Sequence, residues 1–364
     1  KAGLPVMDPE AIQFHPTGIV GPGILASETL RSVGGILRNK ELEPFMEQYA
    51  PKMKELAPRD LVARAIETEI REGRGILNPD HNIEHVWIDL RHLPDYVHDV
   101  ELPEVSGFFK KFINLDPKKD LCPVRPSNHY QMGGIPTNEN GEVQKNPREI
   151  VPGLFAVGEC AAASFHGFNR LGTNSLLELI TMGKFAGEKI IDTLGEDVPD
   201  APKDAGERSF SLFSRFMNAG GKDNLGKIRE EMRNLMTEKV GVFRTEQGMN
   251  DAIEGLRELK ERADKTELAS QSLIMNQDLI QRWELNNLLD NAMVITKGAL
   301  NRKESRGGHF RDDFPERDDT LHYHTLAYMT GFGDVHLENR PVDMSLYDAK
   351  GEHYERFGVI ERKY

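Results

Sequence analysis

The chain has 364 residues, of which 38% are hydrophobic and 29% are charged, a composition that excludes a disordered protein and indicates a globular one. Its 46 Lys and Arg against 59 Asp and Glu residues give a formal net charge of −13, which argues against a nucleic-acid partner. No apolar run approaches the ~20 residues of a membrane span, and two cysteines, Cys122 and Cys160, give no disulfide framework and indicate a reducing compartment.

The first third of the chain predicts strands and turns followed by a helix. Residues 1–36 carry short apolar pieces between glycines, which is typical of strands and tight turns. The first five residues lack the basic and apolar pattern of a signal peptide, so we expect the sequence to start inside a longer protein. Residues 42–74 are predicted to be helical, because apolar residues recur at three- and four-residue spacing from Leu61 to Ile70.

The next segments predict shorter elements. Residues 76–121 are expected to form short helices and loops rich in Pro and His. His81 and His85 stand four apart there, but a third metal ligand is missing, so we expect both on a surface loop. Turn residues surround one short strand at 154–157, which we expect to be buried.

The second half predicts mainly helices. Residues 174–194 form one predicted helix, whose interior Gly183 and Gly187 indicate close packing. The best candidate for a linker is 199–206. Three apolar stripes, which begin at Leu225, Ile253 and Leu279, then predict a small helical bundle. Residues 334–342 return to strand-like alternation.

Five short motifs contain the polar residues most useful for chemistry. They are residues 15–18, 27–31, 58–60, 128–134 and 158–176. Taken alone, the first three are explained better by a turn with a polar cap, a solvated ion pair and a surface arginine, in that order. Two arginines and two histidines in such loops would suit a dicarboxylate, since the planar fork of Arg binds carboxylates.

Local geometry gives some of these residues expected positions. Glu28 and Arg31 are three apart and could form an ion pair on one helical turn. Arg59 follows Pro58 and would project from the start of a helix. A second helix start is predicted at Thr173–Ser175, where backbone N–H groups and the helix dipole would suit the carbonyl or anionic edge of a cofactor ring.

Taken in order, these motifs resemble the flavoprotein subunit of succinate dehydrogenase and fumarate reductase. The matching segments are QFHPTG at 13–18, SETLRSVGGIL at 27–37, APRDLVARAI at 57–66, NHYQMGGI at 128–135, GLFAVGECA at 153–161, HGFNRLGTNSLLEL at 166–179, SRGGHFRDDFPERDD at 305–319, and a tail from RPVDM at 340–344 to RKY at 362–364. The family's N-terminal GxGxxG, and the His that often bonds covalently to FAD, do not occur in this sequence.

The resemblance implies an α+β/α/β multidomain fold: a partial FAD-binding domain with an inserted capping domain, then a C-terminal helical bundle and a small strand region. The implied boundaries are 1–36 and 126–202 for the flavin domain, 37–125 for the capping domain, 203–330 for the helical domain and 331–364 for the C-terminal region.

The resemblance also implies roles for individual residues. The substrate carboxylates would be held by His15, Ser27, His129 and Arg170. The family usually has Thr where Ser27 stands, and Ser keeps the hydroxyl donor. Arg59 matches the catalytic acid and base, and Glu28 and Arg31 match a proton relay. The flavin contacts would be Glu159, Arg170, Ser175 and Leu176.

The implied activity is the interconversion of succinate and fumarate, with a hydride exchanged with FAD N5 and a proton exchanged with Arg59. The implied partners are an iron–sulfur subunit and a membrane anchor that meets quinone, which would hold the protein at the cytoplasmic face of the inner membrane. L-aspartate oxidase is the nearest alternative enzyme, and a non-catalytic fragment that docks on an iron–sulfur subunit is the alternative of another class. Cys160, beside Glu159, could be redox-sensitive, but we favour a buried structural thiol.

Overall fold

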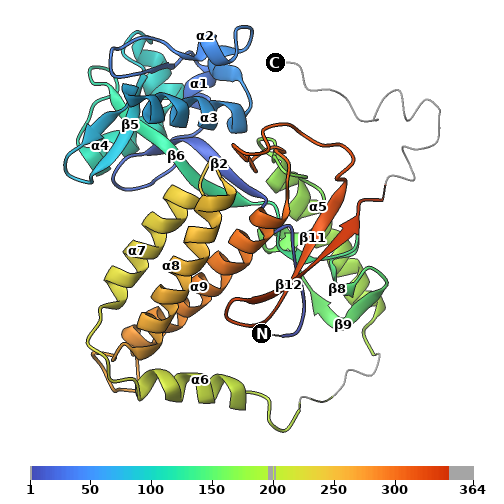
Figure 1. Ribbon diagram of the computed structural model, residues 1–364. Helices are drawn as coiled ribbons and strands as arrows, with labels where there is room; N and C mark the ends of the chain where they lie inside the picture. Colours follow the sequence, from blue (N-terminus) through green and yellow to red (C-terminus); the bar gives the residue numbers. More distant parts are fainter. Residues whose placement is uncertain (1, 196–199, 201, 344–364) are drawn as a thin grey trace, which may run out of the picture. The chain divides into compact units, whose positions relative to one another are not determined.

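The chain folds into two compact units in the computed structural model, which describes residues 2–195, 200 and 202–343 (Figure 1). Unit 1 holds the described residues up to Ala11 and those from Gln131 to Val342, and unit 2 holds Ile12–Tyr130. The predicted boundaries of the five domains stay predictions. Pro199 and Ala201 of the predicted linker, and the matching tail from Met344 onward, lie outside the described residues.

A sheet with one branch forms the centre of unit 2. Its strands follow the order β2 (Ile12–Ile19), β6 (Cys122–Gln131), β5 (Ile83–Asp89) and β3 (Ile36–Arg38), and β4 (Ile76–Asn78) also pairs with β5. Strands β4 and β5 correct the prediction that residues 76–121 contain only helices and loops. Their pairing partners lie far away in sequence, and local patterns do not encode such long-range pairing.

Short helices flank this sheet. They are α1 (Thr29–Ser32), α2 (Met46–Tyr49), η1 (Lys54–Leu56), α3 (Arg59–Glu69), η2 (Ile70–Arg74), η3 (Val97–Glu101) and α4 (Pro103–Ile113). The predicted helix at 42–74 is therefore broken into four pieces. Ala57 has an extended backbone before Pro58, as a residue that precedes proline prefers, and Gly73 has a φ of 78° near the end of η2.

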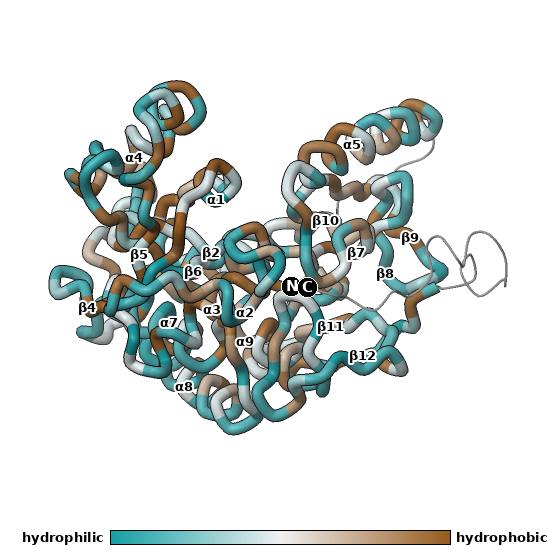
Figure 2. The backbone as a smooth tube through the Cα atoms, turned by 90° about the horizontal axis from the view of Figure 1, so that it is seen from above, coloured by the Kyte–Doolittle hydropathy of each residue, from teal (hydrophilic) through white to brown (hydrophobic). Residues whose placement is uncertain are grey.

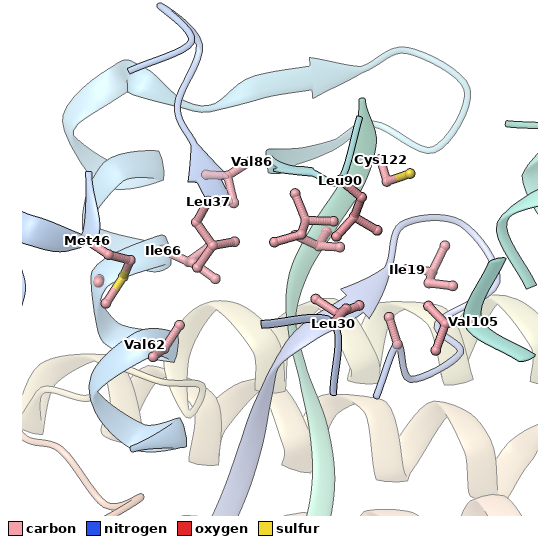
Figure 3. Packing of buried hydrophobic residues seen from close by; sticks show 14 of the residues in the cluster. Ile19, Leu30, Leu37, Met46, Val62, Ile66, Val86, Leu90, Val105 and Cys122 are labelled. Atoms are coloured by element: carbon pink, nitrogen blue, oxygen red, sulfur yellow. The ribbon is translucent and has the colours of Figure 1, made fainter. Parts of the chain in front are cut away.

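The core of unit 2 lies between α3 and the sheet. Val62 and Ile66 of α3 are 0% exposed and pack in one cluster with Leu37 of β3 and Val86 of β5 (Figure 3). Burying one such side chain contributes about 1.5–3 kcal/mol. This packing fixes the orientation of α3, which begins with the candidate residue Arg59.

A buried carboxylate also stabilises unit 2. Glu69 is 1% exposed and accepts hydrogen bonds from Tyr49 Oη at 2.7 Å, Asn39 Nδ2 at 3.1 Å and Arg74 Nε at 2.7 Å. Burial disfavours its ionised form, but the bonds from Arg74, Tyr49 and Asn39 outweigh burial and lower the pKa of Glu69. Its contribution to stability is therefore present at neutral pH and is lost as the pH falls through the lowered pKa.

Replacing Glu69 with Gln is expected to lower the free energy of unfolding by about 2–3 kcal/mol, because it removes the buried charge that three donors share. Urea denaturation at pH 7 measures this loss. Glu72→Gln is the matched control, since Glu72 is exposed and pairs with the same Arg74 at 2.5 Å; its expected cost is below about 1 kcal/mol. Equal losses in both variants would contradict the role of Glu69.

Unit 1 contains three small sheets. The first has the order β1 (Val6–Met7), β11 (Tyr323–Gly331) and β12 (Asp334–Pro341), which confirms the strand predicted at 334–342. The second pairs β7 (Ile135–Pro136) with β10 (Ala161–Ala162), and the third pairs β8 (Glu142–Asn146) with β9 (Glu149–Phe155). The strand predicted at 154–157 is the end of β9, which stops at Phe155; its expected burial was wrong for Leu154, which is 42% exposed, and is confirmed for Ala156, which is 7% exposed.

Two glycines bring the backbones of unit 1 into close contact. A Cβ atom on Gly133 would lie 2.0 Å from the carbonyl oxygen of Asp8, and one on Gly134 would lie 2.5 Å from that of Cys160. Gly134 also exchanges backbone hydrogen bonds with Met7. The two glycines therefore hold the start of the chain against the Cys160 segment.

The helices described in unit 1 are η4 (Gly158–Cys160), α5 (Asn174–Asp192), α6 (Glu207–Met217), α7 (Leu225–Lys239), α8 (Glu246–Lys265) and α9 (Gln277–Asn301). Helices α7, α8 and α9 confirm the predicted bundle. Asn224, Thr245 and Asn276 cap α7, α8 and α9, each accepting a bond from a backbone N–H of the first turn. Within the described part of the chain, no helix is both long and apolar enough to cross a membrane.

Helix α5 differs from the bundle because many of its apolar side chains are exposed. Figure 2 shows the hydropathy of the residues along this helix. The exposed ones are Leu176, Leu177, Leu179, Ile180, Phe185, Ile190 and Ile191. The predicted close packing of its glycines is not seen at Gly187, where an added Cβ would meet no atom within 4 Å.

A fully buried histidine links the loops of unit 1. His309 Nδ1 accepts a hydrogen bond from Arg244 at 2.7 Å, and its Nε2 lies 3.3 Å from the carbonyl oxygen of Arg302. Burial, with the charges of Arg244, Arg302 and Arg311, lowers the pKa of His309 well below its usual value. The folded chain therefore keeps His309 neutral, while the unfolded chain protonates it below about pH 6.5.

Stability is consequently expected to fall as the pH drops below about 6.5, by up to about 1.4 kcal/mol per pH unit from His309 alone. Urea unfolding of the wild type and of His309→Gln between pH 7.5 and 5.0 measures this slope. In the variant, the slope of the unfolding free energy against pH is expected to be smaller by the contribution of one proton. His336→Gln, at an exposed position, should keep the wild-type slope. An unchanged slope in His309→Gln would contradict the assignment.

Candidate functional site

Strands β2 and β6 bring two predicted site residues of unit 2 together. The rings of His15 on β2 and His129 on β6 lie edge to face, with centroids 5.3 Å apart. His15 is fully buried and precedes Pro16, which favours the extended backbone of the strand. His15 Nδ1 lies 3.3 Å from the backbone N of Thr17 and 3.2 Å from the Thr17 hydroxyl, so Thr17 fixes the orientation of the ring.

Thr17 also positions the segment that carries Ser27. Its hydroxyl donates to the carbonyl oxygen of Ala26 at 2.8 Å, and its backbone oxygen accepts from the N–H of Ala26 at 2.9 Å. The hydroxyl of the next residue, Ser27, lies 3.0 Å from that of Thr29 and accepts from the Thr29 N–H at 3.3 Å. Thr17 therefore ties the His15 ring and the Ser27 loop together, a role that sequence reasoning missed.

Glu28 bridges the two predicted catalytic arginines. Its Oε1 accepts from Arg31 NH2 at 2.8 Å, which confirms the ion pair expected from their spacing. Its Oε2 accepts from Arg59 NH2 at 2.8 Å and from Arg59 Nε at 3.2 Å. Arg59 NH1 also donates to Gln13 Oε1 at 3.1 Å. One carboxylate thus connects two guanidinium groups, and Gln13 supports Arg59 from β2.

The charges of this cluster bias its protonation. Burial disfavours the ionised form of Glu28, but hydrogen bonds and charges from Arg59 and Arg31 outweigh burial and lower the pKa of Glu28. Burial lowers the pKa of Arg31, and the charge of Arg59 acts in the same direction, while Glu28 opposes both. The side chain of Arg31 is 1% exposed, and its NH1 donates to the backbone oxygen of Glu55. The cluster therefore favours the ionised form of Glu28, and it makes the neighbouring Arg31 easier to deprotonate than an exposed arginine.

The remaining predicted residues belong to unit 1. Glu159 lies on η4, and its Oε1 accepts from the Gln131 N–H at 3.3 Å. Arg170 donates through NH1 to the hydroxyl of Ser175, in the first turn of α5. Leu176 follows and is 60% exposed. Arg170, Ser175 and Leu176 are therefore grouped at the start of α5, while the role of Arg170 as a substrate ligand beside His15, Ser27 and His129 stays a prediction.

Two predictions about single residues were wrong. Cys160 is exposed, not buried, because it lies on the short helix η4, whereas Cys122 is buried in β6. His85 is 2% exposed on strand β5 and does not lie on a surface loop. Among the described residues, no group of three or more His, Cys, Asp or Glu side chains could hold a metal ion.

Comparison with known proteins gives matches over nearly the whole chain. Residues 1–176 match the family model of an FAD binding domain, and residues 229–364 match that of a fumarate reductase flavoprotein C-terminal region. The mitochondrial succinate dehydrogenase flavoprotein subunit of Oryza sativa subsp. japonica is 43% identical over 97% of this chain and 57% of its own length.

Two further proteins support the same relationship. The fumarate reductase flavoprotein subunit of Proteus vulgaris is 39% identical over 95% of this chain and 59% of its own length. A solved structure of the E. coli quinol fumarate reductase has a TM-score of 0.85 and 37% identity, covering 94% of this chain and 60% of its own. The chain therefore spans less than two thirds of the length of these relatives.

The residues at the start of α5 fit one part of an FAD site. The carboxylate of Glu159 and the hydroxyl of Ser175 can bind hydroxyl and carbonyl groups. The start of this 19-residue helix presents a positive dipole end. The exposed Leu176 offers an apolar surface to a flat ring. These donors and this surface agree with FAD, the cofactor named by the matching domain.

Proposed function

The chain belongs to the family of succinate dehydrogenase and fumarate reductase flavoprotein subunits, and from this premise we propose that it carries the substrate and proton-transfer residues of an enzyme that interconverts succinate and fumarate. The observation that carries the proposal is the bridge from Arg31 through Glu28 to Arg59, which Gln13 joins to β2, the strand that carries His15 of the His15–His129 pair. FAD, when bound, supplies the hydride acceptor or donor of this reaction.

The polar groups of unit 2 suit a dicarboxylate substrate. A ring N–H of His15, the Ser27 hydroxyl and a ring N–H of His129 can each donate a hydrogen bond to a carboxylate oxygen. Arg170 would add a planar fork for bidentate binding. Holding both carboxylates fixes the two central carbons, and such orientation contributes strongly to rate.

Arg59 would move the proton at one central carbon. An arginine is an unusual acid and base because its pKa lies above ~12. Glu28 contacts Arg59 and Arg31 at once, so a proton can move along existing hydrogen bonds between these three side chains. Burial and the like charge of Arg59 lower the pKa of Arg31, which favours proton transfer at the Arg31 end of this chain of bonds.

The partners would be an iron–sulfur subunit and a membrane anchor with quinone, at the cytoplasmic face of the inner membrane. The name of the matched E. coli protein, a quinol fumarate reductase, supports a quinone partner. Relatives named for each direction of the reaction also match this chain, so both directions belong to the proposal.

Steady-state assays of the full-length holoprotein test the proposal. We expect succinate-dependent reduction of an artificial acceptor dye, fumarate-dependent oxidation of a reduced dye, and inhibition of both by the dicarboxylate malonate. Turnover of L-aspartate without turnover of succinate would assign an L-aspartate oxidase. Absence of all three activities from a flavin-loaded protein would favour a non-catalytic fragment that docks on an iron–sulfur subunit.

A further inference from the structure

The loop that carries Arg170 runs from β10 to α5 and is held at its start by a three-residue relay. The hydroxyl of Ser164 lies 2.8 Å from His324 Nε2, and His324 Nδ1 lies 2.6 Å from Asp8 Oδ2. The carboxylate accepts from Nδ1–H, so Ser164 bonds the other nitrogen of a ring that Asp8 already orients. Ser164 and Asp8 have φ values of 62° and 47°, and such left-handed backbone persists only where surrounding contacts hold it.

A second contact holds the same loop two residues before Arg170. The guanidinium of Arg302 stacks on the ring of Phe168, with Cζ 4.4 Å from its centroid. The backbone oxygen of Phe168 accepts from the Gly308 N–H at 2.7 Å. Gly307 has a φ of 56°, and a Cβ atom there would lie 2.2 Å from the same oxygen. The approach of these two backbones therefore requires glycine at position 307.

The two anchors belong to one buried network. Arg302 donates to Glu10 at 2.8 Å and to Glu304 at 3.0 Å. Its NH2 also lies 3.7 Å from Asp8 Oδ1, on the carboxylate that accepts from His324. The side chains of Arg302, Glu10 and Glu304 are at most 1% exposed. The side chains of such a network have few alternative conformations, so the network can fix the position of a backbone segment that contacts it.

We propose that Arg302 and His324 are positioning residues for Arg170, acting through the backbone of residues 164–168. The proposal rests on the proposed function, in which Arg170 binds a substrate carboxylate. Ser175 holds the Arg170 side chain from α5, and the network fixes the backbone that leads to it. Orientation of this kind matters because a misplacement of about 1 Å can cost about 100-fold in rate.

The Ser164–His324–Asp8 order is also that of a nucleophilic triad. The observations favour an anchor, because Asp8 is shared with the Arg302 network and the same loop has a second, independent anchor at Phe168. An anchoring serine stays unreactive towards a fluorophosphonate probe. Covalent labelling of Ser164 in the native protein would contradict the anchoring role.

The test measures malonate binding by calorimetry in the full-length holoprotein. Arg302→Lys keeps the positive charge but removes the planar guanidinium that stacks on Phe168 and donates to Glu10 and Glu304. It is expected to weaken malonate binding about 10-fold. Hydrogen exchange of the backbone at 164–173 should become faster. Ser164→Ala is a milder second variant that removes only the relay, and its expected effect is about threefold.

Arg282→Lys is the matched control. Arg282 is fully buried, stacks on Phe216 at 4.5 Å and pairs with Asp264 at 2.8 Å, within the helical bundle. Its substitution should lower the unfolding temperature and leave malonate binding and the exchange of residues 164–173 unchanged. If Arg282→Lys weakens malonate binding as much as Arg302→Lys does, the effect is general destabilisation and the proposal is wrong.

A double-mutant cycle separates positioning from a general structural role. If Arg302 acts through Arg170, the double variant with Arg302→Lys and Arg170→Gln should bind malonate less than about twofold more weakly than Arg170→Gln alone. Additive losses would overturn the inference. An Arg170→Gln variant that binds malonate as the wild type does would instead remove the proposed role of Arg170. Loss in Arg170→Gln without loss in Arg302→Lys and Ser164→Ala would overturn the inference alone.

Discussion

Replacing Arg59 with Lys in the full-length protein is expected to lower kcat for succinate oxidation about 10³–10⁴-fold, the upper range for loss of a general acid and base. Lysine has a single nitrogen on a flexible stem, so it cannot reproduce the planar geometry in which Arg59 bonds Glu28 through NH2 at 2.8 Å and Gln13 through NH1 at 3.1 Å. Malonate affinity and flavin content should change little, because Arg59 acts mainly on the transition state.

Arg125→Lys provides the control for Arg59→Lys. Arg125 also makes a two-pronged ion pair, with Glu67 at 2.9 and 3.2 Å, and is likewise partly buried in unit 2. We expect a loss of kcat below about threefold, since surface-near ion pairs contribute little. Retention of more than a tenth of kcat in Arg59→Lys would exclude Arg59 as the proton donor and acceptor.

Glu28→Gln is expected to lower kcat about 10²–10³-fold. Its amide oxygen can still accept from one arginine, but its NH2 group faces the other as a second donor, so the bridge between Arg31 and Arg59 is broken. Stopped-flow kinetics with succinate and with succinate deuterated at both central carbons would locate the defect. A larger isotope effect in the variant shows that the chemical step has become slower.

The lowered pKa of Glu28 adds a pH test. Because the wild-type carboxylate stays ionised below its usual range, its titration does not limit activity between pH 5 and 8. Glu28→Gln should therefore lower kcat by a similar factor across this range. Glu67→Gln, which removes a carboxylate that serves only Arg125 in the same unit, should keep the wild-type kcat. Equal losses in both variants would contradict the relay.

The sequence predicted elements and pairs that depend on short spacing. The apolar stripes of α7, α8 and α9 and the Glu28–Arg31 pair follow helical periodicity, and the structure confirms them. The bond from Arg59 to Glu28 spans 31 residues and depends on how the 57–59 turn meets α1, which local spacing does not encode.

The parts that the sequence did not predict share a physical cause. Strand β5 and the support of Arg59 by Gln13 depend on pairing and packing between distant segments. Gln13 and Thr17 stand inside the motif at 13–18, where their polarity and alternation with His15 on β2 could have marked them as members of the same face. Cys160 was expected to be buried as a structural thiol and Leu154 as part of a short apolar strand, yet both are exposed.

Anaerobic addition of succinate to the full-length holoprotein, with the flavin absorbance recorded and L-aspartate added in a parallel cuvette, tests the central claim most directly. Our account predicts that succinate bleaches the flavin band, that L-aspartate does not, and that fumarate restores the band. Bleaching by L-aspartate alone, or no bleaching by either compound in a protein that contains flavin, would contradict it.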